Sequence, residues 1–153
     1  MSPCCCNVEK SPSTDKPTYI YKLVPYTSPV PLDPATLPIA LPISDIDQTS
    51  GFIHLSTAPQ IPGTLVSFFK SDPRIYVLRL PYDPLERLGQ IKWESPEGDV
   101  CGPRPGEGLF PHLYNGLRLG REEVESVWVL ERGEGGWVDV IERDGEFKAW
   151  LAY

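Results

Sequence analysis

The sequence predicts a single α+β domain with short strands and long loops, and three observations support this fold class. The chain has 153 residues, of which 41% are hydrophobic, a length and composition that suit one core rather than two. Prolines number 18, and none lies beyond Pro111. Because proline removes a backbone donor and interrupts helices, an all-helical bundle is disfavoured through residues 17–111. Runs of β-branched and aromatic residues between the prolines then favour strands.

The first half of the chain is expected to hold three strands and the main helix. The strands are predicted at residues 19–24, 51–56 and 75–80. A long proline-rich loop, with a short helical turn near 33–37, is expected over 25–50, and loops of this length are usually functional or mobile. Apolar residues recur at helical spacing from Ile61 to Phe69, so the main helix is predicted within 57–70.

The second half is expected to end in a β-hairpin. A turn or short helix is predicted at 84–89, a short strand at 91–94, a surface loop at 95–108 and a helical turn at 121–126. The hairpin is formed by strands at 127–130 and 137–141, which flank a turn at 131–136. We therefore treat residues 18–153 as one domain.

The charge of the chain limits its partners. Acidic residues outnumber basic ones, the net charge is −7, and the basic residues do not cluster. Bulk binding to DNA or RNA is disfavoured, because it depends on concentrated positive charge, although a local phosphate pocket stays open. No apolar run is long enough for a signal peptide or a membrane span. The default expectation is a cytoplasmic protein in a reducing setting.

Residues 1–17 are predicted to form a flexible leader, because they are polar and contain almost no apolar residues. Three of the four cysteines are the consecutive run Cys4, Cys5 and Cys6. Either these thiols are idle, or they are S-acylated and tether the protein to a membrane surface. Metal binding by the run is less favoured, because adjacent sulfurs cannot easily face one tetrahedral ion and no histidine is near.

The two histidines are the first candidates for chemistry. His54 lies in the predicted strand 51–56, close to Ser56, and His112 follows a Phe-Pro pair and precedes Tyr114. Imidazole titrates near neutral pH and both donates and accepts hydrogen bonds. Each histidine is therefore a candidate acid, base or hydrogen-bond donor to a phosphate. The alternative is a structural histidine bonded to a backbone carbonyl.

The string Lys92-Trp93-Glu94 is the next candidate. A carboxylate partly desolvated by an indole can transfer protons, and the ring of Trp93 offers a stacking face for a base or nicotinamide. The alternative is an edge strand in which Trp93 packs in the core and Glu94 is merely solvated.

Other motifs carry less weight. Asp45 and Asp47 could suggest a metal or sugar-phosphate site, but short acidic pairs before a strand more often cap local backbone amides in a turn. No metal is expected. Neither a Gly-x-Ser-x-Gly motif nor a paired-cysteine motif occurs, which weakens common hydrolase and zinc assignments.

Several strings, taken in order, carry a resemblance to a known family. They are Tyr19 to Leu23, Gly51-Phe52-Ile53-His54-Leu55-Ser56-Thr57 with Gln60, the helix ending in Phe68-Phe69, Lys92-Trp93-Glu94, and Phe110-Pro111-His112-Leu113-Tyr114. Over residues 18–130 the chain resembles the small uncharacterised family called domain of unknown function 952. The resemblance implies the ADP-ribosyltransferase fold, in which two small, roughly perpendicular sheets and one main helix surround a cleft. Active members of that fold bind nicotinamide adenine dinucleotide (NAD) there.

The second strand is also similar to the histidine-bearing strand of RNA 2′-phosphotransferases of the same fold. There a histidine followed by a small hydroxyl residue helps to hold the dinucleotide, which implies that His54 contacts the adenylate or ribose, with Ser56 near it. In the first strand those enzymes have another histidine, where this chain has Tyr21-Lys22. The glutamate of classical transferases has no clear equivalent in this chain unless Glu94 takes that role.

The resemblance thus implies cleavage at the anomeric carbon of the nicotinamide ribose, with attack by an acceptor. The implied catalytic residues are His54, Glu94 and His112. The implied binding residues are Tyr21, Lys22, Ser56, Thr57, Gln60, Trp93 and Tyr114. Among these, Lys22 would clamp the diphosphate, and Trp93 or Tyr114 would stack on nicotinamide.

Three functional classes are therefore carried forward. The first is an enzyme of the transferase fold that acts on NAD or a related nucleotide-like small molecule. The second is an acid/base enzyme that uses the two histidines on another small metabolite. The third is a non-catalytic nucleotide-binding module. The sequence indicates no oligomeric state.

Overall fold

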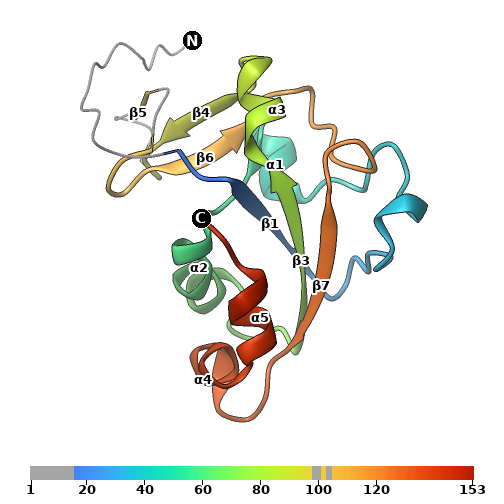
Figure 1. Ribbon diagram of the computed structural model, residues 1–153, viewed down its shortest axis with the longest axis vertical. Coiled ribbons are helices and arrows are strands. Elements are labelled where there is room, and N and C mark those ends of the chain that lie inside the picture. The colour runs from blue at the N-terminus through green and yellow to red at the C-terminus, as the bar shows by residue number, and fades with distance from the viewer. Residues whose placement is uncertain (1–15, 98–100, 103–104) are drawn as a thin grey trace.

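The computed structural model describes residues 16–97, 101–102 and 105–153, and these residues form an α+β fold with two antiparallel sheets (Figure 1). Within them, the first sheet has the strand order β1-β3-β7 and the second the order β2-β6-β4-β5. The first sheet comprises β1 (Tyr19–Pro25), β3 (Arg74–Pro81) and β7 (Ser126–Glu131). The second comprises β2 (Ile53–His54), β4 (Ile91–Glu94), β5 (Cys101–Gly102) and β6 (Phe110–Leu113).

Short helices connect and cover the sheets. They are α1 (Asp45–Ser50), α2 (Ile61–Phe68), α3 (Tyr82–Arg87), α4 (Gly136–Arg143) and α5 (Gly145–Trp150), with 3-10 turns at Pro34–Thr36 and Ala58–Gln60. Helices α2, α4 and α5 gather on one side of the first sheet (Figure 1). In the part of the chain that is described, no helix is both long and apolar enough to cross a membrane.

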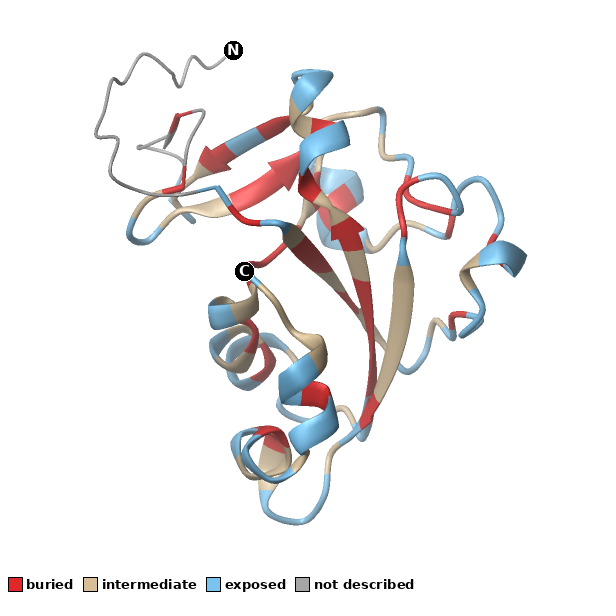
Figure 2. Cartoon of the chain, in the orientation of Figure 1, coloured by how far each residue is buried: buried red, intermediate tan, exposed pale blue. Residues whose placement is uncertain are grey.

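The first sheet packs against one hydrophobic core on each face, and neighbouring residues of a strand point to opposite cores. On β1, Ile20 belongs to a core shared with the second sheet, whereas the next residue, Tyr21, belongs to a core shared with the three helices. The central strand β3 repeats this alternation and is buried over most of its length (Figure 2). Full burial of one aliphatic side chain such as Leu65 of α2 stabilises the fold by about 1.5–3 kcal/mol.

The two sheets meet at one isolated bridge between Tyr21 of β1 and Ser56. The amide of Tyr21 donates to the carbonyl of Ser56 at 2.8 Å, and the amide of Ser56 donates back at 2.9 Å. The bridge lies immediately before Lys22 and two residues after His54. It therefore brings the first strand against the histidine-bearing segment.

Much of the expected element order is confirmed. The strands predicted at 19–24, 75–80 and 91–94 correspond to β1, β3 and β4. The short turn expected near 33–37 and the helix expected within 57–70 are also present.

The predicted terminal hairpin is wrong. Its first strand exists as β7, but residues 137–141 lie in helix α4. Trp137 and Ile141, four residues apart, are both buried beside α2, whereas Val138 between them is half-exposed. The ion pair between Asp139 and Arg143, at 2.9 Å, also joins residues four apart, which are neighbours on the surface of a helix. Packing against α2 thus overrides the β propensity of valine and isoleucine in this segment.

Three smaller predictions also need correction. There is no single main helix, because α4 has eight residues, as α2 does. Helix α1 interrupts the predicted loop 25–50, and the predicted strand 51–56 shortens to β2. Residues 1–15 of the predicted leader, with Cys4, Cys5 and Cys6, lie outside the described residues. Its next residue, Lys16, forms an ion pair with Glu86 at 2.9 Å.

Candidate functional site

A cavity of about 670 Å³ opens between β1, α1 and the edge of the second sheet. Its polar lining includes Lys22, Asp47, His54, Ser56 and His112. These side chains come from β1, α1, β2, the residues just after β2, and β6. The site is therefore assembled by the meeting of the two sheets, and both histidines predicted from the sequence line it.

Asp47 organises one side of the cavity. Its backbone amide is capped by the hydroxyl of Ser44, so its own carboxylate is free to point inward. One oxygen accepts from Nδ1 of His54 at 2.7 Å and from the His54 amide at 3.1 Å. The other accepts from Nζ of Lys22 at 2.6 Å. Asp47 as a whole is only 1% exposed, so its carboxylate holds two functional groups in a dry environment.

Glu94 organises the other side. Its Oε1 lies 2.7 Å from Nδ1 of His112 and accepts a hydrogen bond from the hydroxyl of Tyr114 at 2.7 Å. In the register of β4 and β6, Lys92 pairs with His112 and Glu94 with Phe110, so the carboxylate reaches the histidine diagonally across one sheet face.

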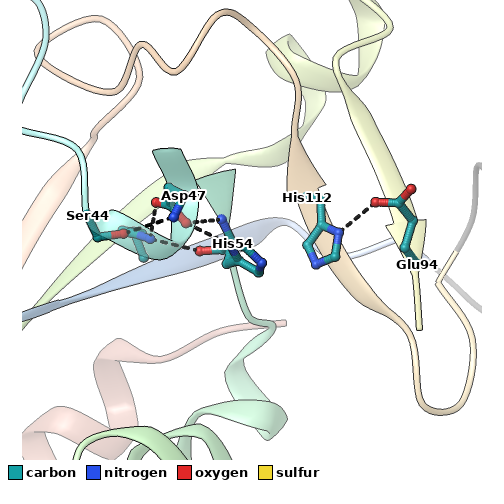
Figure 3. A network of polar contacts seen from close by, with 6 residues as sticks. Ser44, Asp47, His54, Glu94 and His112 are labelled. Carbon is teal, nitrogen blue, oxygen red and sulfur yellow. Dashed lines mark hydrogen bonds and ion pairs between the residues drawn. The ribbon is translucent and has the colours of Figure 1, made fainter. Parts of the chain in front are cut away.

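The two imidazoles lie side by side, flanked by their carboxylates. Figure 3 shows Asp47 next to His54 and Glu94 next to His112, with the histidines between the two acids. Direct pairing of the two histidines across β2 and β6 sets this arrangement, and the ring centroids lie 5.0 Å apart. The ring of Phe52 stacks on His112 at 4.3 Å and contacts His54 at 4.6 Å. Phe52 thus restricts rotation of both imidazoles.

The buried charges of the site perturb each other. Burial raises the pKa of Asp47, but the hydrogen bonds from His54 and Lys22 outweigh it, and the net pKa lies below its ordinary value. Burial lowers the pKa of Lys22, and the pairing with Asp47 only partly opposes this effect. Burial likewise lowers the pKa of His112 despite the hydrogen bond to Glu94. We therefore expect Asp47 to be ionised and His112 to be neutral at neutral pH.

Both histidines have one ring nitrogen left for a ligand. Each Nδ1 is engaged by a carboxylate, and neither Nε2 makes a hydrogen bond within residues 16–97, 101–102 and 105–153. An ionised carboxylate fixes the Nδ1–H tautomer, which leaves the lone pair of a neutral imidazole on Nε2. Two orientated imidazoles can therefore act on one bound molecule.

The remaining predicted site residues divide into two groups. Ser56 is buried, lines the cavity and lies 3.2 Å from the hydroxyl of Thr64, another lining residue. Tyr114 lies behind the site and contacts Phe52 and Glu94. Its ring also receives the ammonium of Lys92 at 4.5 Å. These residues support the site or line it.

The other group does not face the cavity. Thr57 and Gln60 form a capping box, and Gln60 also donates to the carbonyl of Leu109 at 2.8 Å, so both hold backbone. Tyr21 points to the opposite face of β1, where its hydroxyl pairs with the backbone of Ala152. The stacking role expected of Trp93 needs correction. Its ring is 1% exposed and its Nε1 donates to the hydroxyl of Tyr82, because alternation along β4 turns it into the core.

Sequence reasoning missed two residues of the site. Asp47 was assigned to local turn capping, whereas Ser44 does the capping and Asp47 binds His54 and Lys22. Phe52 contacts both imidazoles, and its position two residues before His54, which puts the two side chains on one face of a strand, is the sequence signal for it. Throughout the described ranges, no group of three or more histidine, cysteine or acidic side chains is placed to hold a metal ion.

Comparisons with known proteins identify relatives but no activity. The sequence matches, over residues 38–127, the family described as "Protein of unknown function (DUF952)". A crystal structure of protein CC0527 from Caulobacter crescentus has 28% sequence identity and a TM-score of 0.54, with 78% of this chain and 91% of that chain covered. A solution NMR structure of the same protein has 25% identity and a TM-score of 0.52, over 78% and 90% of the two chains. The curated proteins include no match. Because the family match covers more than half of its residues, the chain belongs to the DUF952 family.

Proposed function

We propose that this protein is an acid/base enzyme that moves protons on a small molecule bound in the cavity. One observation carries the proposal. Two imidazoles, each orientated through Nδ1 by a carboxylate, lie with ring centroids 5.0 Å apart at the wall of a 670 Å³ cavity. Cavities of about 300–1,000 Å³ are typical of small-molecule sites.

The surroundings of the two histidines differ enough to suggest separate roles. The side chain of His112 is 7% exposed, and its lowered pKa keeps it neutral, so its Nε2 is the base. The side chain of His54 is 33% exposed and stands beside the ionised carboxylate of Asp47, which compensates an imidazolium. His54 is therefore the acid.

A carbonyl compound illustrates the step. Nε2 of His112 takes a proton from the carbon next to the carbonyl, and the electron pair of that C–H bond forms the C=C bond of an enol. The carbonyl oxygen takes a proton from Nε2 of His54 as the C=O π bond breaks. One proton leaves the substrate and one arrives, so no oxidant or reductant is needed. The enol then takes a proton from Nε2 of His112 at carbon, at the same or another position, while its O–H proton returns to Nε2 of His54, which resets both histidines.

A transferase activity on NAD is the second candidate. The grouping of this family with the ADP-ribosyltransferase fold, implied by the strings around His54 and His112, favours it, and the cavity volume suits a nucleotide portion. The charges favour it less. Lys22 is the one lysine or arginine among the described lining residues, and Asp47 already neutralises it. The absence of Trp93 from the cavity wall also removes one expected stacking partner.

The direct test is solvent hydrogen exchange catalysed by the protein. A series of methyl ketones of increasing chain length is incubated with the protein in D₂O, and loss of the α-proton signal is followed by proton NMR. We expect exchange above the buffer rate, and we expect His112→Gln and His54→Gln each to reduce it by about 10²-fold or more. Glutamine keeps a polar side chain of similar reach but cannot exchange protons.

NAD is tested in parallel, with release of nicotinamide as the readout. Folding of each variant is checked by circular dichroism and by its urea midpoint. Ketone exchange that is equal in wild-type protein and in the folded double variant would overturn the acid/base proposal. Nicotinamide release that depends on His54 would support the transferase in its place.

A further inference from the structure

The cavity wall has two chemical parts that come from different segments of the chain. One part is polar, and its centre is the connected cluster of Lys22, Asp47, His54 and His112. The apolar groups come mainly from the segments that surround this cluster. They are Val24 and Val30, Leu41, Ile43 and Ile46, and the end of α2 at Phe68 and Phe69.

The order of residues along β1 shows how the two parts join. Lys22 and Val24 are two residues apart and therefore point to the same face of the strand. Lys22 pairs with Asp47, whereas Val24 packs against the core that includes Val30 and Leu41. A molecule that extends from the histidines along β1 thus passes from polar to apolar wall.

The charge of the wall selects against anions. Within the described residues, its lysine and acidic side chains are Lys22, Asp45 and Asp47, which have a formal sum of −1. The single ammonium is held 2.6 Å from Asp47 and is not available to a second anion. A carboxylate or phosphate entering this wall would lose hydration and would find no lysine or arginine that is not already paired.

Exposed hydrophobic side chains also mark the rim. Phe68 is 72% exposed and Ile46 is 54% exposed, although both line the cavity. Large apolar side chains at the mouth of a cavity gain burial when an apolar ligand enters, which favours such a ligand by the area that it covers.

We infer that the substrate is an uncharged molecule with an extended apolar body and one polar end, and that its polar end lies at the histidines. The placement of the polar end at the histidines rests on the proposed acid/base function. The preference of the cavity for an uncharged, apolar molecule does not. The carbonyl group of a ketone, aldehyde or amide fits the polar end. The apolar body lies along Val24 and reaches the rim at Phe68.

Binding of a matched pair of probes tests the inference. Octanamide and octanoate have nearly the same shape, and only octanoate carries a charge. Both are titrated, at one fixed pH, into the protein with the neutral dye Nile red, whose fluorescence reports an apolar site. We expect octanamide to displace the dye at least about tenfold more strongly than octanoate, and ADP-ribose not to displace it. Equal or stronger displacement by octanoate or ADP-ribose would overturn the inference.

Two truncations locate the binding. Phe68→Ala removes the apolar rim, and Leu88→Ala removes a side chain of similar exposure, 70%, that lies outside the cavity lining. We expect Phe68→Ala to weaken octanamide binding by about three- to tenfold and Leu88→Ala to leave it unchanged. Equal effects of both changes would mean that the dye binds the surface non-specifically and would contradict the inference.

The outcome is separable from that of the proposed function. Binding preferences are measured without turnover, and His112→Gln is expected to keep the preference for octanamide while it loses ketone exchange. Preference without exchange would refute the acid/base function alone. Exchange without preference would refute the substrate class alone.

Discussion

Neutralisation of Asp47 is the change that most directly tests how the site is held together. Asp47→Asn removes the charge that faces Lys22 at 2.6 Å while it preserves the size of the side chain. Removing one partner of a buried ion pair typically costs about 3–5 kcal/mol, because the other charge is left without compensation. Small domains have total stabilities of about 5–15 kcal/mol. We therefore expect the variant to lose a large part of its free energy of unfolding.

The loss should depend on pH in a defined direction. Without Asp47, burial is expected to lower the pKa of Lys22 further below 10.5 than in the wild type. The unfolded variant then binds a proton that the folded variant has released, so the stability of the variant rises with pH up to the unfolded pKa. The slope is at most about 1.4 kcal/mol per pH unit. The gap between variant and wild type should thus narrow from pH 7 toward about pH 10.

Urea denaturation at a series of pH values measures these effects. Asp45→Asn is the matched control, since Asp45 is exposed in the first turn of the same helix, and it should cost about 0.3–1 kcal/mol. Adding Lys22→Met to Asp47→Asn should recover about 1–3 kcal/mol. A loss below about 1 kcal/mol at pH 7, or a gap that does not narrow with pH, would refute the account of this pair.

Three further predictions concern other parts of the structure. Because burial holds the pKa of His112 below 6.5, the stability contributed by the neutral ring is lost as pH falls through the depressed pKa. His112→Gln should make the urea midpoint less dependent on pH between about pH 6.5 and pH 5. An unchanged slope of the midpoint against pH would contradict this. Tyr21→Phe should cost about 1–3 kcal/mol in urea denaturation, because the backbone of Ala152 loses its partner, while octanamide binding stays constant. Weakened octanamide binding by Tyr21→Phe would contradict the placement of Tyr21 on the opposite face of β1 from the cavity. Gly120→Ala should lower the thermal midpoint and cost about 2 kcal/mol or more, because its Cβ would lie 2.2 Å from the carbonyl oxygen of Ile39. A neutral Gly120→Ala would show that the segment at Ile39 can move away.

Local patterns were sufficient to predict the strands that are buried. The segments 19–24 and 75–80 contain runs of aromatic and β-branched residues, which are typical of strands and not of helices. The same rule failed at 137–141, because Trp-Val-Asp-Val-Ile supports both a strand and a helix. Contact with α2, which is distant in sequence, decides between them. Helix α1 escaped prediction because its six residues carry no apolar period, and its cap at Ser44 is the main local signal.

The candidate site was predictable where residue type alone marks chemistry. His54, His112 and Glu94 were identified as titratable groups in unusual strings, and the structure brings all three into one network. Asp47 was not assigned to the site, because its role depends on Lys22, which lies 25 residues earlier in the chain. For Trp93 the sequence left two interpretations open, stacking on a ligand or packing in the core, because the alternation along β4 does not reveal which face is covered.

The pair of amides that joins Tyr21 to Ser56 makes the cavity sensitive to any hinge motion between the sheets. Lys22 belongs to the first sheet on one side of this joint, whereas the two histidines belong to the second sheet, and Asp47 in α1 lies with them beside β2. A rotation that breaks these two backbone hydrogen bonds would also separate Lys22 from the carbonyl of His54, to which it donates at 3.3 Å. Hydrogen exchange at the amides of Tyr21 and Ser56 would therefore report how often the cavity opens, and ligand binding should slow exchange at both positions together.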